Sequence, residues 1–167
     1  MIYIDDHIEE FDLREALAAV SPQRRDYALR YRQERDQRLC LAAYRLLQRA
    51  LMLEYGIDGM PVFTYDSKGK PLLQGHPDIH FSLSHCHEAV AVALSDHPVG
   101  IDIETTGHYS AEVAFTRLWT MKESLYKLTG DDHCGDIAQM LDNATRYSFA
   151  TTVHSSYLCT VCSPMQS

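Results

Sequence analysis

Two acidic residues at the end of an apolar segment are the first candidates for chemistry in this sequence. Residues 100–104 read Gly-Ile-Asp-Ile-Glu, and such alternation of apolar and acidic residues is typical of a β-strand. Side chains two apart in a strand point to the same face, so Asp102 and Glu104 would lie side by side. Paired carboxylates raise each other's pKa unless a cation lies between them, and oxygen ligands suit a hard cation such as Mg²⁺. Taken alone, however, the pair is better explained as two solvated acids at a strand end.

A second set of polar residues lies in residues 118–130, where the pattern predicts a helix that ends at Gly130. Trp119, Glu123 and Lys127 follow one another at intervals of four, so they share one face of this helix. By spacing alone this is an ordinary helix face with Trp119 in the core. Glu123 would then pair with Lys127.

Two further motifs lie upstream: a turn at Gly69-Lys70-Pro71, and a predicted strand that ends in Ser84-His85. In combination, the four motifs resemble the 4′-phosphopantetheinyl transferases, in particular the surfactin-synthetase-activating type. The family pattern has a Ser-His strand, a Gly-Ile-Asp-Ile-Glu strand and a Trp-x-x-Lys-Glu-x-x-x-Lys helix, in this order. The resemblance extends over residues 24–162.

The resemblance implies an enzyme that moves 4′-phosphopantetheine from coenzyme A to a serine of an acyl or peptidyl carrier protein, with release of 3′,5′-ADP. It implies a Mg²⁺ cofactor held by Asp102, Glu104 and Glu123. Glu123 is the expected acceptor of the serine proton, with Glu104 as the alternative. Lys127 would face the leaving phosphate, and Trp119 would pack the helix and shape the pocket.

The resemblance also implies a set of residues that bind coenzyme A: Arg38, Lys70, Pro71, Ser84, His85 and Lys127. Arg38 is assigned to the 3′-phosphate, although the local alignment needs a shift of one residue, and Arg25 and Arg30 are weaker alternatives. Arginine suits this role because its planar guanidinium binds phosphate oxygens in pairs. His85 would hold another phosphate oxygen, and Lys70 would lie beside the adenine and the phosphates.

The elements that must position these residues predict an α+β fold in which antiparallel strands pack with helices. Strands are expected at 2–6, 61–65, 80–85, 89–94, 99–104, 146–153 and 157–162, and helices at 11–20, 22–55 and 118–129. The helical pattern of 22–55 is long for a globular protein, so we expect a break within 32–36. The resemblance implies two pseudo-related α/β halves: residues 1–104, with the basic helix and the Ser-His strand, and residues 105–167, with the Trp helix. The halves would form one compact unit.

Composition limits the classes of function. The net charge of the 167-residue chain is −8, which disfavours nucleic acid as a partner, whereas the basic residues gathered between Arg24 and Arg49 suit a small polyanion. Apolar runs are too short to cross a membrane, and the N-terminus lacks signal-peptide features. Five cysteines, an odd number, argue against a disulfide framework and fit a reducing cytoplasm. We therefore expect a cytoplasmic protein, and a monomer, since two pseudo-related halves can complete a site.

Two alternative functions stay open. A module that binds coenzyme A or a carrier protein without turnover would not need Asp102, Glu104, Glu123 and Lys127 together. Another magnesium-dependent phosphotransferase is the second, and the lack of a GxxxxGK[ST] loop argues against a nucleoside triphosphate enzyme. Family members usually carry a longer segment before the Trp helix, which helps receive the carrier protein. Either the chain is compact here, or its sequence omits mobile residues here and after Gly130; we favour the second.

Overall fold

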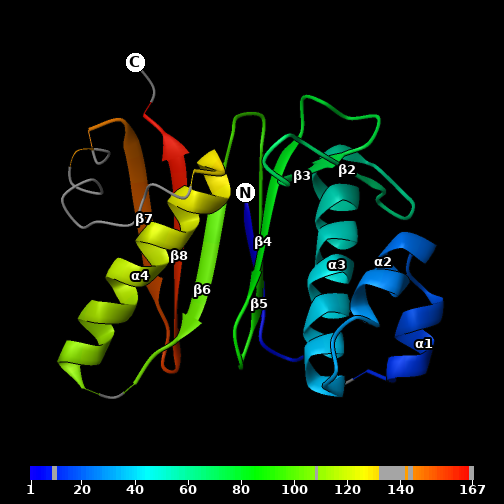
Figure 1. The fold of residues 1–167 in the computed structure, drawn as a ribbon, viewed down its shortest axis with the longest axis horizontal. Coiled ribbons are helices and arrows are strands. Elements are labelled where there is room, and N and C mark those ends of the chain that lie inside the picture. Colours follow the sequence, from blue (N-terminus) through cyan, green and yellow to red (C-terminus); the bar gives the residue numbers. More distant parts are fainter. Residues whose placement is uncertain (9–10, 108, 132–141, 143–144, 166–167) are drawn as a thin grey trace.

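The computed structural model describes residues 1–8, 11–107, 109–131, 142 and 145–165. Two three-stranded antiparallel sheets lie next to each other, and one long helix covers the outer side of each (Figure 1). The order of layers in this view is α4, the sheet β6-β8-β7, the sheet β1-β5-β4, and α3 with the short helices α1 and α2. The architecture therefore confirms an α+β fold with antiparallel strands.

The N-terminal unit is built around one long helix and one sheet. Its elements are β1 (Ile2–Asp5), α1 (Leu13–Ala18), α2 (Pro22–Ala28), α3 (Glu34–Tyr55), β4 (His80–His85) and β5 (Val90–Ser95). Asp12 and Ser21 cap α1 and α2 with their side chains, and Gly56 ends α3 in the left-handed conformation that glycine adopts most easily. The helical pattern is interrupted at residues 29–33, which confirms the predicted break and places it slightly earlier.

A small hairpin connects α3 to the sheet. β2 (Phe63–Tyr65) pairs with β3 (Pro71–Leu73), and the side chain of Asp66 accepts the backbone N–H groups of Lys68 and Lys70 at the turn. Gly69 has a φ of 82° in this turn. The turn was predicted, but β3 was not, because a three-residue strand leaves too short a pattern to detect.

The C-terminal unit contains β6 (Gly100–Thr105), α4 (Ser110–Thr129), β7 (Tyr147–Val153) and β8 (Tyr157–Pro164). Its sheet has the order β6-β8-β7. Along the chain, the edge strand β6 comes first, followed by the helix α4, the second edge strand β7 and the central strand β8. β1, α3, β4 and β5 follow in the same order in the other unit. The helix α4 begins eight residues before the predicted start at 118, where Tyr109 and Glu112 form a capping box.

The two sheets meet through small side chains and through a seam between the edge strands β4 and β6. Ala91 and Ala93 of β5 pack against Ile101 and Ile103 of β6, whereas Val90, Val92 and Leu94 on the other face of β5 pack in the core with α3. At the seam, the hydroxyls of Ser82 and Ser84 accept the backbone N–H groups of Ile101 and Ile103 at 3.1 and 3.2 Å. Both pairs advance in the same direction, so β4 and β6 run parallel. Serine side chains thus replace part of a backbone ladder.

The strand pairings place β6 in the second sheet, because β6 pairs with β8. The chain therefore passes from one sheet to the other between β5 and β6. The division of the chain into two halves at Glu104 stays a prediction. No helix among the described residues is both long and apolar enough to cross a membrane.

Candidate functional site

Ser84, Asp102 and Lys127 form a hydrogen-bonded cluster where β4, β6 and α4 meet. The Lys127 Nζ lies 2.5 Å from Asp102 Oδ1 and donates to the Ser84 hydroxyl at 2.8 Å, and that hydroxyl in turn donates to Asp102 Oδ1 at 2.9 Å. Asp102 is only 3% exposed. A buried carboxylate needs a cationic partner, and here it finds one 25 residues away on α4. The helical spacing had predicted that Lys127 pairs with Glu123. In the structure Lys127 pairs with Asp102 instead.

Asp102 has an unused acceptor. Its Oδ2 is buried and has no hydrogen-bond partner within the described part of the chain. Glu104 lies next to it on β6 and is half-buried; burial, followed by the charge of Asp102, raises the pKa of Glu104, while the charge of Lys127 opposes this shift. A carboxylate oxygen without a hydrogen-bond partner, next to a second carboxylate whose charged form is disfavoured, offers the oxygen ligands that a hard cation such as Mg²⁺ prefers.

The three carboxylates predicted to hold a metal lie on two elements: Asp102 and Glu104 on β6, and Glu123 on α4. The possible ligand atoms of these three residues are not all within 4.8 Å of one another. Among the described residues, only the group Asp5, Asp6 and His7 has its ligand atoms that close together. The ammonium group of Lys127 carries the positive charge beside Asp102 in this arrangement.

A cavity of about 410 Å³ adjoins the cluster, and both units contribute to its walls. Its lining comes from α2, the β2–β3 turn, β4 and the end of α4: Tyr27, Lys68, Gly69, Lys70, Pro71, Phe81, Ser82, Leu83, Tyr126, Lys127 and Gly130. The predicted cofactor residues Lys70, Pro71 and Lys127 are thus brought together. Several walls are apolar or aromatic and three lysines stand among them, which suits a ligand with a flat ring and phosphates.

Two lysines of the β2–β3 turn reach the C-terminal end of α4. Lys68 Nζ donates to the carbonyl of Thr129 at 2.8 Å, and Lys70 Nζ donates to the carbonyls of Leu128 and Val99 at 3.2 and 3.1 Å. The last carbonyls of a helix lack partners within it and carry partial negative charge, so cations are favourable there. Partial burial lowers the pKa of Lys70.

His85 stands at the end of β4, close to positive charge. Partial desolvation lowers the pKa of His85, and the charges of Lys127 and Arg24 lower it further. Arg24 donates to the carbonyl of Cys40 at 2.7 Å, and its guanidinium lies 5.1 and 5.6 Å from the ring centroids of Tyr27 and Tyr44. Desolvation disfavours a charge of either sign, but the positive charges of Lys127 and Arg24 favour an anion beside His85.

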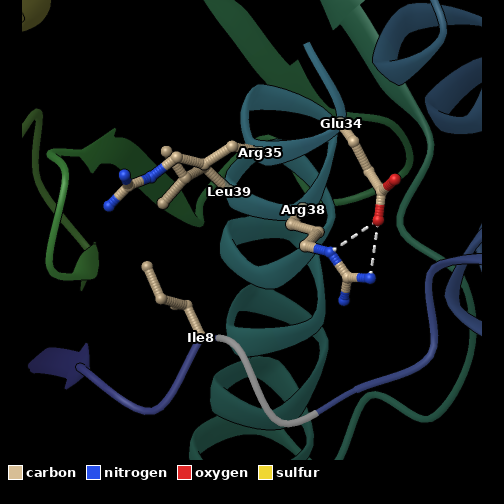
Figure 2. Close-up of a pocket in the computed structure, with 5 residues that line it drawn as sticks. All are labelled: Ile8, Glu34, Arg35, Arg38 and Leu39. Carbon is tan, nitrogen blue, oxygen red and sulfur yellow. Dashed lines mark hydrogen bonds and ion pairs between the residues drawn. The ribbon is translucent and has the colours of Figure 1, made fainter.

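Arg38, the predicted 3′-phosphate ligand, lies outside this cavity. It lines a different one with Ile8, Glu34, Arg35 and Leu39, as Figure 2 shows. Its guanidinium pairs with Glu34 at 2.8 Å and donates to the carbonyl of Phe11, and it points away from the guanidinium of Arg35 (Figure 2). The role of Arg38 in binding coenzyme A stays a prediction, whereas the charge of Arg24 acts directly on His85.

Arg24, Lys68, Tyr27 and Tyr126 were not among the predicted site residues. Lys68 and Tyr126 lie close in sequence to the predicted motif residues Lys70 and Lys127, but only the tertiary structure shows that they line the same cavity. Arg24 belongs to the basic region in which Arg38, and more weakly Arg25 and Arg30, were preferred.

The comparisons with known proteins agree with this geometry. The chain is 28% identical over 153 residues to the 4′-phosphopantetheinyl transferase Sfp of Bacillus subtilis (strain 168), which covers 77% of this chain and 68% of the relative. It is 30% identical over 151 residues to 4′-phosphopantetheinyl transferase psf-1 of Bacillus pumilus (76% and 65%) and to gsp of Aneurinibacillus migulanus (76% and 61%). No family model matches.

The chain thus spans about two thirds of the length of the curated relatives that it matches. Several such relatives share one enzymatic name, and the aligned part, 76–77% of this chain, is too long to lie within one unit of the fold. From the agreement of relatives, motifs and clustered polar residues we conclude that the chain belongs to the 4′-phosphopantetheinyl transferase superfamily, in its Sfp-like type.

Proposed function

We propose that this protein transfers 4′-phosphopantetheine from coenzyme A to a serine hydroxyl of an acyl or peptidyl carrier protein, with Mg²⁺ and with release of 3′,5′-ADP. The observation that carries the proposal is the cluster of Ser84, Asp102 and Lys127 beside the lysine-lined cavity. It combines a cation for the leaving group with a buried carboxylate that has a free oxygen.

Coenzyme A would bind in the cavity between the two units. Tyr27, Phe81 and Pro71 offer flat or apolar surfaces for the adenine, and the charges of Lys127 and Arg24 would attract the phosphates. His85 is the neighbouring group that can donate to a phosphate oxygen. Because the pKa of His85 is lowered, the ring gains its second proton, and with it a charge-assisted donor, only in more acidic solution.

Asp102, Glu104 and Glu123 would hold the magnesium ion, Asp102 through its unpartnered Oδ2. When bound, the ion supplies positive charge that offsets the charge of the pyrophosphate. Lys127, which lines the cavity, would hold its ammonium group toward the phosphates.

Residues of this chain would then accept the serine proton and neutralise the charge on the leaving phosphate. The serine oxygen of the carrier protein attacks the β-phosphorus of coenzyme A, and the bond from that phosphorus to the oxygen bridging to the 5′-phosphate of 3′,5′-ADP breaks. Glu123 accepts the serine proton. Glu104 is the alternative, because burial raises its pKa and so makes it a stronger base. The ammonium group of Lys127 neutralises the charge that develops on the leaving phosphate.

A single copy contains all the proposed groups, which supports a monomer as the functional unit. The equal order of elements in the two units supports the view that they are pseudo-related halves. None of the described cysteines forms a disulfide, in agreement with action in the cytoplasm.

The decisive experiment incubates the purified protein with coenzyme A, Mg²⁺ and an apo carrier protein and follows the intact mass of the carrier. The proposal is supported if the carrier gains the mass of one phosphopantetheine group and if this gain does not occur in a reaction that contains EDTA. Binding of coenzyme A by calorimetry without any mass gain favours a binding module. Absence of both would exclude coenzyme A as the substrate and leave another phosphotransferase.

A further inference from the structure

One rung of the C-terminal sheet holds three polar side chains beneath α4. Asp102 of β6 is opposite Thr160 of β8, and Thr160 is opposite Thr151 of β7. Residues opposite one another in adjacent strands project to the same face of a sheet. Thr160 is fully buried, and its hydroxyl lies 2.9 Å from that of Thr151.

The helix α4 contacts this rung at two points. Lys127 contacts Asp102, and the fully buried hydroxyl of Thr120 lies 2.7 Å from that of Thr160. Thr120 and Lys127 are seven residues apart, about two helical turns or about 10 Å along the axis. Glu123 lies between them, three residues after Thr120 and four before Lys127, so it projects from the same side of the helix.

The three hydroxyls form one continuous chain of hydrogen bonds. The Thr120 hydroxyl lies 3.0 Å from the carbonyl of Arg117, to which it can donate, and it can then accept from Thr160 at 2.7 Å. Thr160 can in turn accept from Thr151 at 2.9 Å. Either hydroxyl can be the donor in each threonine pair, and the contacts are the same in both cases.

Apolar packing also holds α4 on the sheet, since Leu125 and Leu128 pack with Cys162 of β8 and Phe149 of β7. A Cβ atom on Gly100 would lie 1.9 Å from the carbonyl of Ser124, so helix and strand approach closely at this glycine. A buried polar pair adds a directional contact that specifies the register of a helix, as it does in coiled coils. A shift of about 1 Å would already break a hydroxyl contact of this length.

We propose that Thr120 and Thr160 are positioning residues that fix the register of α4 on the sheet and thereby place Glu123 and Lys127 against Asp102. The inference rests on the proposed function for its catalytic consequence. Neither threonine touches substrate; both act through α4.

Substitution by valine tests this, because valine keeps the volume of threonine and removes only the hydroxyl. Thr120→Val and Thr160→Val each leave a buried hydroxyl without its partner, so each should lower both stability and kcat. In the double variant the pair is gone, and stability should recover toward the parent. Turnover should not recover: kcat stays about tenfold to about a hundredfold below the parent, with the KM for coenzyme A little changed.

Two further variants sharpen the result. Thr120→Ser keeps the hydroxyl and should restore kcat. Thr152→Val is the matched control, since Thr152 is exposed on β7, next to Thr151 and on the opposite face, and should change neither quantity. A double variant whose kcat returns together with its stability, or a Thr120→Val enzyme with the kcat of the parent, would overturn the inference.

A crystal structure of the double variant gives a readout that needs no activity: α4 should move along the sheet, and the contact between Lys127 and Asp102 should lengthen. If the parent modifies no carrier protein but α4 moves, the proposed function fails and the positioning inference stands. An active parent whose double variant keeps α4 in place and turns over normally refutes the positioning inference and leaves the function intact.

Discussion

Replacement of Lys127 by methionine should destabilise the protein strongly, although lysines on helix surfaces usually contribute little. The change keeps most of the aliphatic side chain and removes the charge beside Asp102. Asp102 is 3% exposed and its Oδ2 has no partner among the described residues, so within this part of the chain the carboxylate would keep only the Ser84 hydroxyl as a donor. A buried charge left unpaired is costly because water cannot replace the lost partner.

The magnitude follows from the burial of the two partners. Removal of one member of a buried ion pair costs about 3–5 kcal/mol, and the Lys127 side chain is 28% exposed, so we expect the low end, about 3 kcal/mol. For a domain of this size, each kcal/mol lowers the melting temperature by about 2–4 °C, which gives a fall of about 6–12 °C. An exposed pair of Lys127 with Glu123 would have contributed only about 0.3–0.5 kcal/mol.

Urea unfolding at neutral pH, followed by circular dichroism, measures this difference in free energy. Asp102→Asn and the double variant complete a cycle: the double variant should be more stable than the sum of the single effects predicts, by about 1–3 kcal/mol. Lys122→Met is the matched control, because Lys122 lies on the same helix and its ammonium group lies over the ring of Trp119, 5.0 Å from the ring centroid. A loss below about 1 kcal/mol for Lys127→Met, or additive effects, would refute the burial argument.

Three further predictions concern the site. Asp102→Asn should reduce transfer by orders of magnitude at saturating Mg²⁺ while the protein stays folded; near-normal turnover would exclude Asp102 as a metal ligand. Since the pKa of Glu104 is raised, the folded state binds its proton more tightly than the unfolded state, and stability should fall as the pH rises above about 4.5. Glu104→Gln should flatten that fall in urea titrations between about pH 4 and about pH 7; a parallel curve would contradict the raised pKa. Calorimetry should show that coenzyme A binds the parent more weakly as the pH rises and His85 loses its proton, and His85→Ala should remove this pH dependence. Arg24→Ala should weaken the binding of coenzyme A by about 1–3 kcal/mol. Arg38→Ala, whose guanidinium pairs with Glu34, should have little effect; the reverse ranking of Arg24 and Arg38 would restore the original assignment.

The elements that carry the site were predictable because their signals are local. Alternation in residues 80–85 and 100–104 gave both edge strands, and the outer bounds of the helical pattern predicted for 22–55 agree with the start of α2 and the end of α3. Backbone preference and burial on one face act within a few residues, so they can be detected in a short window. The four motifs, taken in order, were also sufficient to suggest the family.

Weak or distant signals explain the elements that were missed. β3 has only three residues, and the first two turns of α4 carry exposed apolar residues, among them Phe115 at 68% exposure, which blur the amphipathic pattern. The strand β6 was detected, but its partner β8 lies more than fifty residues further along the chain. No local pattern states which sheet a strand joins.

The polar residues show the same division most clearly. The sequence alone determined that Asp102 and Glu104 would share a strand and that Glu123 and Lys127 would share a helix face. Only the tertiary structure decided that Lys127 pairs with Asp102, that the charge of Arg24 reaches His85, and that Thr120 contacts Thr160. Spacing along one element offers a residue several partners, and burial selects among them. A carboxylate removed from water must take the nearest cation, and packing of the two units determines which cation that is.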